Sequence, residues 1–197
     1  MSEPLFDPDK TYDRLLLTAA RLFATKGYAG TTVRDLAGEL GLTSGSLFHH
    51  VRSKDDILFA VMERVVTAMT QELAAALGAA PDTRARLRAL IDVELRYLHG
   101  QASHATAVLF HEWRALPEAR RALLLAGRGS YFDLWHQVLL DAQSQGLTQV
   151  DPATLRQFLH GALAWTSFWY RPDGTLSVAD LADQAMRLIA PETVPTP

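Results

Sequence analysis

The sequence predicts an all-α protein, because apolar residues recur at three- and four-residue spacing along almost the whole chain. The period-two alternation of a half-buried strand is nowhere sustained. Glycine, proline and capping residues separate the periodic stretches. Nine helices are therefore expected, over residues 7–27, 31–40, 43–50, 53–78, 83–100, 103–115, 117–146 and 151–170, with the ninth starting at residue 177.

The first two helices have recognisable ends. Asp7 followed by Pro8 is expected to cap the first helix, which Gly27 stops. Thr31 or Thr32 is expected to cap the short second helix.

The third and fourth helices also begin at hydroxyl residues. Thr43 or Ser44 opens a short third helix. Ser53 to Asp56 resembles a capping box with Asp in place of Glu, and it opens the long fourth helix, which ends near Gly78.

The last five helices are separated by turn residues. Thr83 starts the fifth, Pro117 opens the seventh, and Asp151 with Pro152 caps the eighth. Ser177 opens the ninth, after a turn of sequence Arg-Pro-Asp-Gly.

Composition excludes several classes of protein. The 197 residues are 48% apolar and carry a net charge of −3, so they can bury a core but offer no general polycation to nucleic acid. The absence of cysteine excludes disulfides, thiolate metal sites and a cysteine nucleophile. Apolar runs are too short to span a membrane, and the acidic start is unlike a signal peptide, which predicts a cytoplasmic protein without membrane contact.

Two short helices joined by a glycine turn are typical of a helix-turn-helix, whose second helix enters the major groove of DNA. The whole run over residues 23–37 and 41–54 closely resembles the N-terminal DNA-binding domain of the TetR/AcrR family of bacterial transcriptional regulators. Ser44 stands where that family frequently has lysine, and Phe48 replaces its usual tyrosine. The resemblance implies that DNA is contacted by Thr31, Thr32, Arg34, Thr43, Ser44, Gly45, Phe48, His49 and Lys54.

Each of these residues also has a purely structural explanation. The threonines are good helix caps, and Phe48 fits a core position. Lys54 stands in the first turn of a helix, where a cation opposes the helix dipole unless an anion lies nearby. Residues 1–60 carry seven Lys and Arg against eight Asp and Glu, so DNA affinity must come from a few placed contacts, doubled by dimerisation.

The chain changes character after Gly78, because all four tryptophans follow it. Aromatic residues in a helical domain are often core, but together they also suit an apolar ligand site. The resemblance implies that this half binds a small-molecule effector and forms a homodimer through the last two helices, unless their apolar stripes only cover the subunit's own core. The candidate ligand contacts are Tyr97, Phe110, His111, Trp113, Arg114, Tyr131, Trp135, Trp165, Trp169 and Arg171.

A weaker resemblance concerns the type of effector. Residues 110–114 and 165–171 are similar to a TetR subgroup that senses acyl-CoA thioesters and controls lipid, steroid or aromatic-acid catabolism. The expected protein is then a repressor released from a palindromic operator by an apolar or acyl-CoA effector, with no other cofactor. The predicted domains are residues 1–60 for DNA binding and 61–190 for effector binding and dimerisation, followed by a disordered tail at 191–197.

Three alternatives remain open at this stage. The first alternative is a multidrug-sensing repressor of an efflux gene. The second is an acyl-ester-handling enzyme that uses His111, Glu112 and Arg114, and the third is a DNA-bridging protein without an effector. A zinc-protease helix is excluded, because the position four residues after His111 is Ala115. The sequence also contains no nucleophile with a positioned base, so no catalytic residues are assigned.

Overall fold

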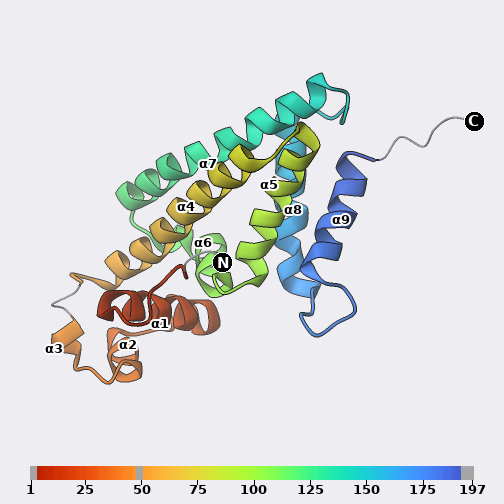
Figure 1. Cartoon of the computed structure of the whole chain (residues 1–197). Coiled ribbons are helices and arrows are strands. Elements are labelled where there is room, and N and C mark those ends of the chain that lie inside the picture. Colours follow the sequence, from red (N-terminus) through yellow and green to blue (C-terminus); the bar gives the residue numbers. More distant parts are fainter. Residues whose placement is uncertain (1–3, 48–50, 192–197) are drawn as a thin grey trace, which may run out of the picture. The chain divides into compact units, whose positions relative to one another are not determined.

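The computed structural model describes residues 4–47 and 51–191. This part of the chain is helical throughout, as predicted, and contains nine α-helices and one short 3₁₀ helix, η1 (Figure 1). The helices are α1 (Thr11–Lys26), α2 (Val33–Glu39), α3 (Ser44–Leu47), α4 (Lys54–Ala79), α5 (Thr83–His99), α6 (Ser103–His111), η1 (Trp113–Ala115), α7 (Glu118–Ser144), α8 (Pro152–Trp169) and α9 (Val178–Ile189). The predicted extension of the third helix to residue 50 lies outside the described residues.

The contacts divide the chain into two compact units. The first comprises Met1–Ala68 and Gln101–Arg128, and the second comprises Met69–Gly100 and Gly129–Pro197. In the first unit α1 packs against α2 and α6. In the second unit α5 packs against α8 and α9, and these three helices lie side by side in Figure 1.

Side-chain caps fix the start of four helices. Thr32 and Ser177 form reciprocal capping boxes at α2 and α9, so each donates and accepts a hydrogen bond within the first turn. Asp82 and Asp151 each accept a backbone N–H at the start of α5 and α8. These are positions at which the sequence placed the caps or the helix starts.

Two predicted boundaries are wrong by several residues. The first helix begins at Thr11, because the Asp7 side chain accepts from the amide of Asp9 and the Lys10 amide donates to the Asp7 carbonyl oxygen, which closes a separate turn. The sixth helix ends at His111 and gives way to η1. The following Pro117 holds Leu116 in an extended conformation, so an α-helix cannot continue to that point.

No helix among the described residues has the length and apolar character needed to cross a membrane.

Candidate functional site

The helices α2 and α3 form a helix-turn-helix. Gly41, with φ of 68°, ends the first helix in a left-handed conformation that favours glycine. The amide of Leu42 then donates to the Ala37 carbonyl oxygen at 2.9 Å, which closes the turn. Leu36 and Leu47 are fully buried, so both helices are anchored on their inner faces.

The first turn of α3 is exposed and small. The Thr43 hydroxyl accepts from the Ser46 amide at 3.2 Å and lies 2.9 Å from the Ser46 hydroxyl. A Cβ atom added at Gly45 would meet only the Thr43 hydroxyl oxygen, at 3.9 Å. Nothing in the described part of the chain therefore requires glycine at position 45, although glycine weakens a helix.

The start of α2 combines a cap with an exposed cation. The Thr32 hydroxyl and backbone amide both donate to the Asp35 carboxylate, each at 2.7 Å. These hydrogen bonds from Thr32 hold the pKa of Asp35 below its usual range. Arg34 is exposed and has no carboxylate within ion-pair distance among the described residues. The structure thus leaves Arg34 available to a phosphate.

Thr31 lies inside the first unit. Its side chain is fully buried, and its hydroxyl donates to the Gly27 carbonyl oxygen at 2.9 Å. Its amide donates to the Tyr28 carbonyl oxygen at 3.2 Å. Thr31 therefore shapes the turn between α1 and α2, whereas Thr32 is exposed at its surface.

Lys54 is partly buried at the start of α4. Its ammonium donates to the carbonyl oxygens of Tyr28 and Thr31, both at 2.9 Å, and lies 4.0 Å from the centre of the Tyr28 ring. These carbonyl dipoles offset the unfavourable position of a cation in the first turn. An ammonium has three N–H groups, so one remains for a phosphate.

Tyr28 is held from three sides within the first unit. Its amide donates to Glu112 at 3.1 Å, its carbonyl oxygen accepts from Lys54, and its hydroxyl donates to Asp55. Burial, and then the hydrogen bond to Asp55, raise the pKa of the Tyr28 hydroxyl. Glu112, considered from the sequence as a catalytic residue, is thus bonded to the turn that precedes α2.

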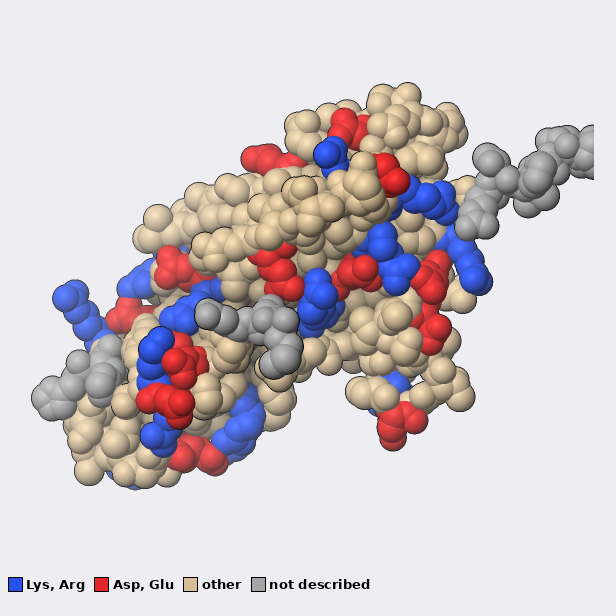
Figure 2. All heavy atoms as spheres, viewed as in Figure 1, with Lys and Arg blue, Asp and Glu red and all other residues tan. Residues whose placement is uncertain are grey.

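Phe48 and His49, the two remaining predicted DNA contacts, lie outside the described residues. On the visible face of the described residues, acidic and basic side chains are interspersed over α1 and α2 (Figure 2). Arg21, for example, pairs with Glu39 at 2.5 Å. Any contact with DNA therefore depends on individual cations.

The ten predicted effector contacts are divided between the two units. Phe110, His111, Trp113 and Arg114 belong to the first unit, at the end of α6 and in η1. His111 and Arg114 are exposed, and the Arg114 guanidinium lies 5.8 Å from the Trp113 ring centre.

The six contacts in the second unit differ sharply in burial. Trp135 is 0% exposed and lies 6.4 Å from Tyr131, measured between ring centroids, whereas Trp165 is 61% exposed. Trp169 and Arg171 are also exposed, at the end of α8 and just beyond it. The remaining contact is a tyrosine, Tyr97, which is buried.

Two polar residues near Trp135, the buried Glu94 and the partly buried His160, escaped the sequence-based prediction. Glu94 on α5 is only 1% exposed and accepts hydrogen bonds from the Tyr131 hydroxyl and from His160 Nδ1, the latter at 3.3 Å. The sequence does contain a signal for Glu94, because this acidic residue follows Leu87 and Leu90 on the apolar face of α5. A carboxylate in such a stripe indicates a special environment.

The α8 helix carries an exposed apolar face. Phe158 is 67% exposed and Trp165 61%, and Gly161 and Ala162 lie exposed between them. On α9, by contrast, Leu181, Ala182, Met186 and Ile189 are buried, and α9 packs on α5 of the same unit. Of the two stripes considered for dimerisation, the one on α8 faces outward, whereas the one on α9 is mostly buried in its own unit, with Leu188 84% exposed.

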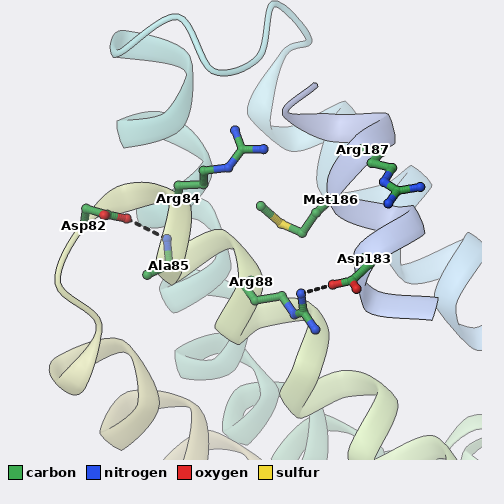
Figure 3. A pocket seen from close by; sticks show the side chains of 7 residues that line it. All are labelled: Asp82, Arg84, Ala85, Arg88, Asp183, Met186 and Arg187. Carbon is green, nitrogen blue, oxygen red and sulfur yellow. Dashed lines mark hydrogen bonds and ion pairs between the residues drawn. The ribbon is translucent and has the colours of Figure 1, made fainter. Parts of the chain in front are cut away.

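A pocket of about 540 Å³ lies between the start of α5 and α9 (Figure 3). Arg84 reaches from α5 toward α9, Met186 extends back toward α5, and Arg88 pairs with Asp183. This lining suits a polar group better than an acyl chain, and it contains none of the ten predicted contacts. No three His, Asp or Glu side chains in the described chain are placed to hold a metal ion.

Comparisons with known proteins agree with this architecture. The family described as "Bacterial regulatory proteins, tetR family" matches residues 15–61, and "Tetracyclin repressor-like, C-terminal domain" matches residues 80–191. The transcriptional repressor KstR2 of Rhodococcus jostii is 31% identical over 180 residues, which cover 89% of this chain and 87% of that protein.

Solved structures extend the likeness over nearly the whole chain. The superantigen PfiT is 44% identical, with a TM-score of 0.79, over 93% of this chain and 97% of its own. AibR, solved in complex with isovaleryl coenzyme A and operator DNA, is 28% identical with a TM-score of 0.85, over 92% of this chain and 99% of its own. The helix-turn-helix, the nine-helix fold and both family matches together place this chain in the TetR family of bacterial transcriptional regulators.

Proposed function

We propose that the chain is a homodimeric repressor that binds a palindromic operator and is released by an apolar or acyl-CoA effector. The observation that carries the DNA-binding role is the exposed first turn of α3, where no described residue gives Gly45 a reason to be glycine. A glycine there allows the DNA backbone to approach closely. Such a protein acts where its operator is, which for a bacterial regulator is the cytoplasm.

The residues divide into contacts and supports. We assign contact with DNA to Thr32, Arg34, Thr43, Ser44 and Gly45, together with Phe48, His49 and the remaining N–H of Lys54. Thr31 supports the turn through its bond to Gly27. Residues 1–60 thus recognise the operator DNA, whereas residues 61–190 respond to the effector and form the dimer.

The exposed face of α8 is the proposed dimer interface. Two copies of Phe158, Trp165 and Trp169 would bury large apolar side chains that otherwise face water. Gly161 lies between them, and no atom of the chain lies within 4 Å of a Cβ added there, so a second helix has room to approach. A two-fold dimer presents two α3 helices to half-sites about 34–36 Å apart.

The effector class is inferred from relatives and from the cations. AibR was solved with an acyl-CoA and operator DNA, and it covers nearly this whole chain. Arg171 is exposed beside the aromatic end of α8, where a CoA phosphate can meet it. A multidrug sensor would need no cation at this position, so a role of Arg171 in binding distinguishes the two candidate effector classes.

The test is release of operator-bound protein. A preferred DNA site is first selected from random duplexes, and bound protein is then titrated with octanoyl-CoA and with octanoate. We expect release by the thioester at lower concentration. Release by neutral or cationic apolar compounds alone would favour the multidrug sensor, and hydrolysis of the thioester would favour the enzyme.

Arg171→Ala locates the phosphate contact. A hydrogen bond to a charged group contributes about 1.5–3 kcal/mol, so octanoyl-CoA should bind more weakly by roughly 10- to 150-fold while octanoate is little affected. Arg84→Ala, in the pocket between α5 and α9, is the matched control. A larger loss in the Arg84 variant would move the phosphate site to that pocket.

A further inference from the structure

A buried polar cluster lies among aromatic rings in the second unit. Glu94 comes from α5, Tyr131 and Trp135 from α7, and His160 from α8. The Glu94 carboxylate accepts from the Tyr131 hydroxyl and is 3.3 Å from His160 Nδ1. Two donors from two helices therefore hold a carboxylate that is almost completely buried, as such a group requires.

Two nitrogens of this cluster have no hydrogen-bond partner among the described residues. They are Trp135 Nε1 and His160 Nε2, and each atom is buried. The indole N–H is only a donor, so it needs an acceptor whatever the protonation of its neighbours. A buried donor without an acceptor costs about 1–3 kcal/mol, so an oxygen that accepts this N–H would stabilise the cluster.

The two nitrogens belong to rings in direct contact. The centroids of Trp135 and His160 are 4.4 Å apart at an interplanar angle of 45°, and the Phe132 ring lies 5.5 Å from that of His160. Because His160 Nδ1 faces Glu94, its Nε2 is directed away from the carboxylate. An apolar surround with a few unpaired polar atoms is the usual composition of a small-molecule site.

We propose that Trp135 Nε1 donates to an uncharged oxygen, a carbonyl or hydroxyl, carried by the apolar part of the effector, and that His160 Nε2 accepts from this oxygen where it is a hydroxyl. This inference rests on the proposed function, since it names how the effector is recognised. A carbonyl oxygen accepts from Trp135, and a hydroxyl both accepts from Trp135 and donates to His160 Nε2 when the ring proton is on Nδ1. A carboxylate on the effector is disfavoured, because the negative charge of Glu94 would repel it. The Arg156 guanidinium is also nearby and lies over the Phe132 ring, 4.5 Å from the ring centre.

The indole proton of Trp135 reports directly on this bond. The probes are acetophenone, which carries a carbonyl, ethylbenzene, which has the same ring without oxygen, and benzoate, which is charged. Full-length protein labelled with ¹⁵N is titrated with each, and the Trp135 signal is identified by its loss in Trp135→Phe. We expect acetophenone to move that signal downfield, and ethylbenzene to leave it without a hydrogen-bond shift.

Trp135→Phe keeps an aromatic ring and removes the donor. The affinity for acetophenone should fall by about 3- to 10-fold, the range for one neutral hydrogen bond, while the affinity for ethylbenzene is unchanged. Glu94→Gln removes the negative charge, so benzoate should bind more tightly than to the wild type. If Trp135→Phe fails to fold, the Trp135 signal is assigned as the one that persists in Trp113→Phe, Trp165→Phe and Trp169→Phe, and the wild-type shifts then decide.

Three results would overturn the proposal. They are equal responses of the Trp135 signal to acetophenone and ethylbenzene, stronger binding of benzoate than of acetophenone, or no shift with any probe because an internal water already accepts the indole N–H. Operator release is measured separately with octanoyl-CoA. If octanoyl-CoA releases the protein from its operator but the Trp135 signal does not respond, only the oxygen site is rejected. If acetophenone binds at Trp135 but no effector releases the protein from DNA, only the proposed repressor mechanism is rejected.

Discussion

The helix-turn-helix and the α8 helix present opposite kinds of surface. The first turn of α3 exposes small hydroxyl residues and a glycine, whereas α8 exposes phenylalanine and tryptophan side chains. Small polar groups suit the close approach of a charged polymer, and large apolar groups suit burial against another protein surface. The difference teaches that the two recognition tasks lie on separate elements of the chain, although binding of a palindromic operator still depends on the dimer.

The strongest test of this separation is Gly161→Glu. Side chains facing each other across the proposed two-fold axis would bury two unpaired carboxylates, which should yield monomers in sedimentation. Operator affinity should then fall by on the order of 1000-fold, toward the non-specific level.

The subunit itself should survive this change, because a Cβ at position 161 meets no atom within 4 Å. Gln137→Glu, at an exposed position of α7, is the control and should remain dimeric. An intact Gly161→Glu dimer would place the interface elsewhere.

The second test concerns Lys54→Ala, at the DNA-binding end. Loss of the two carbonyl contacts should lower the free energy of unfolding by about 1.5–3 kcal/mol. If the third N–H binds a phosphate, the slope of log affinity against log salt should also fall by roughly 0.9 per subunit, for all DNA sequences alike.

Chemical denaturation and binding isotherms at several salt concentrations measure the two effects separately. Arg84→Ala removes the same charge in the other unit and should change neither. An unchanged slope would leave Lys54 as a support of the Tyr28 turn only.

Gly45→Ala should affect stability and DNA binding in opposite directions. Alanine favours a helix over glycine by about 1 kcal/mol, and the structure leaves space for its methyl group, so thermal stability should rise slightly. A methyl group against the DNA backbone should weaken operator binding, by roughly tenfold for a clash of moderate size. Tighter or equal binding would show that DNA does not approach Gly45.

The smallest expected effect is a pH dependence of stability from His99. Its Nε2 lies 2.7 Å from the Thr166 hydroxyl oxygen, and burial lowers the pKa of this imidazole below 6.5. Below pH 6.5 the unfolded chain therefore takes up a proton before the folded chain does, so stability is lost as the pH falls through the folded-state pKa.

Denaturation between pH 8 and pH 5 measures this loss. His99→Gln keeps a donor toward Thr166 but does not titrate, so its stability should fall less steeply. His104→Gln, at an exposed position, should follow the wild type. Equal slopes for His99→Gln and the wild type would assign the pH dependence to other groups.

The helix-turn-helix region could be predicted well from the sequence. Helix ends depend on local chemistry, so Thr32, Ser177 and Gly41 could be interpreted from neighbouring residues alone. The helix-turn-helix could therefore be predicted from the helix ends and the glycine turn. The start of α1 was misplaced because Asp7 uses its side chain for a turn of its own, a competition between two local hydrogen-bonding patterns.

The effector half was less predictable because aromatic residue type does not determine burial. Trp135 and Trp165 had equal standing in the sequence, yet one is 0% and the other 61% exposed. The role of Glu94 depends on His160, 66 positions later, and such pairing appears only when α5 and α8 pack together. Lys54 is a similar case, since its carbonyl partners lie more than twenty residues earlier.

The hold on Tyr28 has a mechanical consequence. Its peptide N–H is tied to the end of α6 through Glu112, and its carbonyl and hydroxyl are tied to the start of α4 through Lys54 and Asp55. A shift of α6 along its axis must therefore either break the 3.1 Å hydrogen bond from Tyr28 to Glu112 or move the turn that precedes α2.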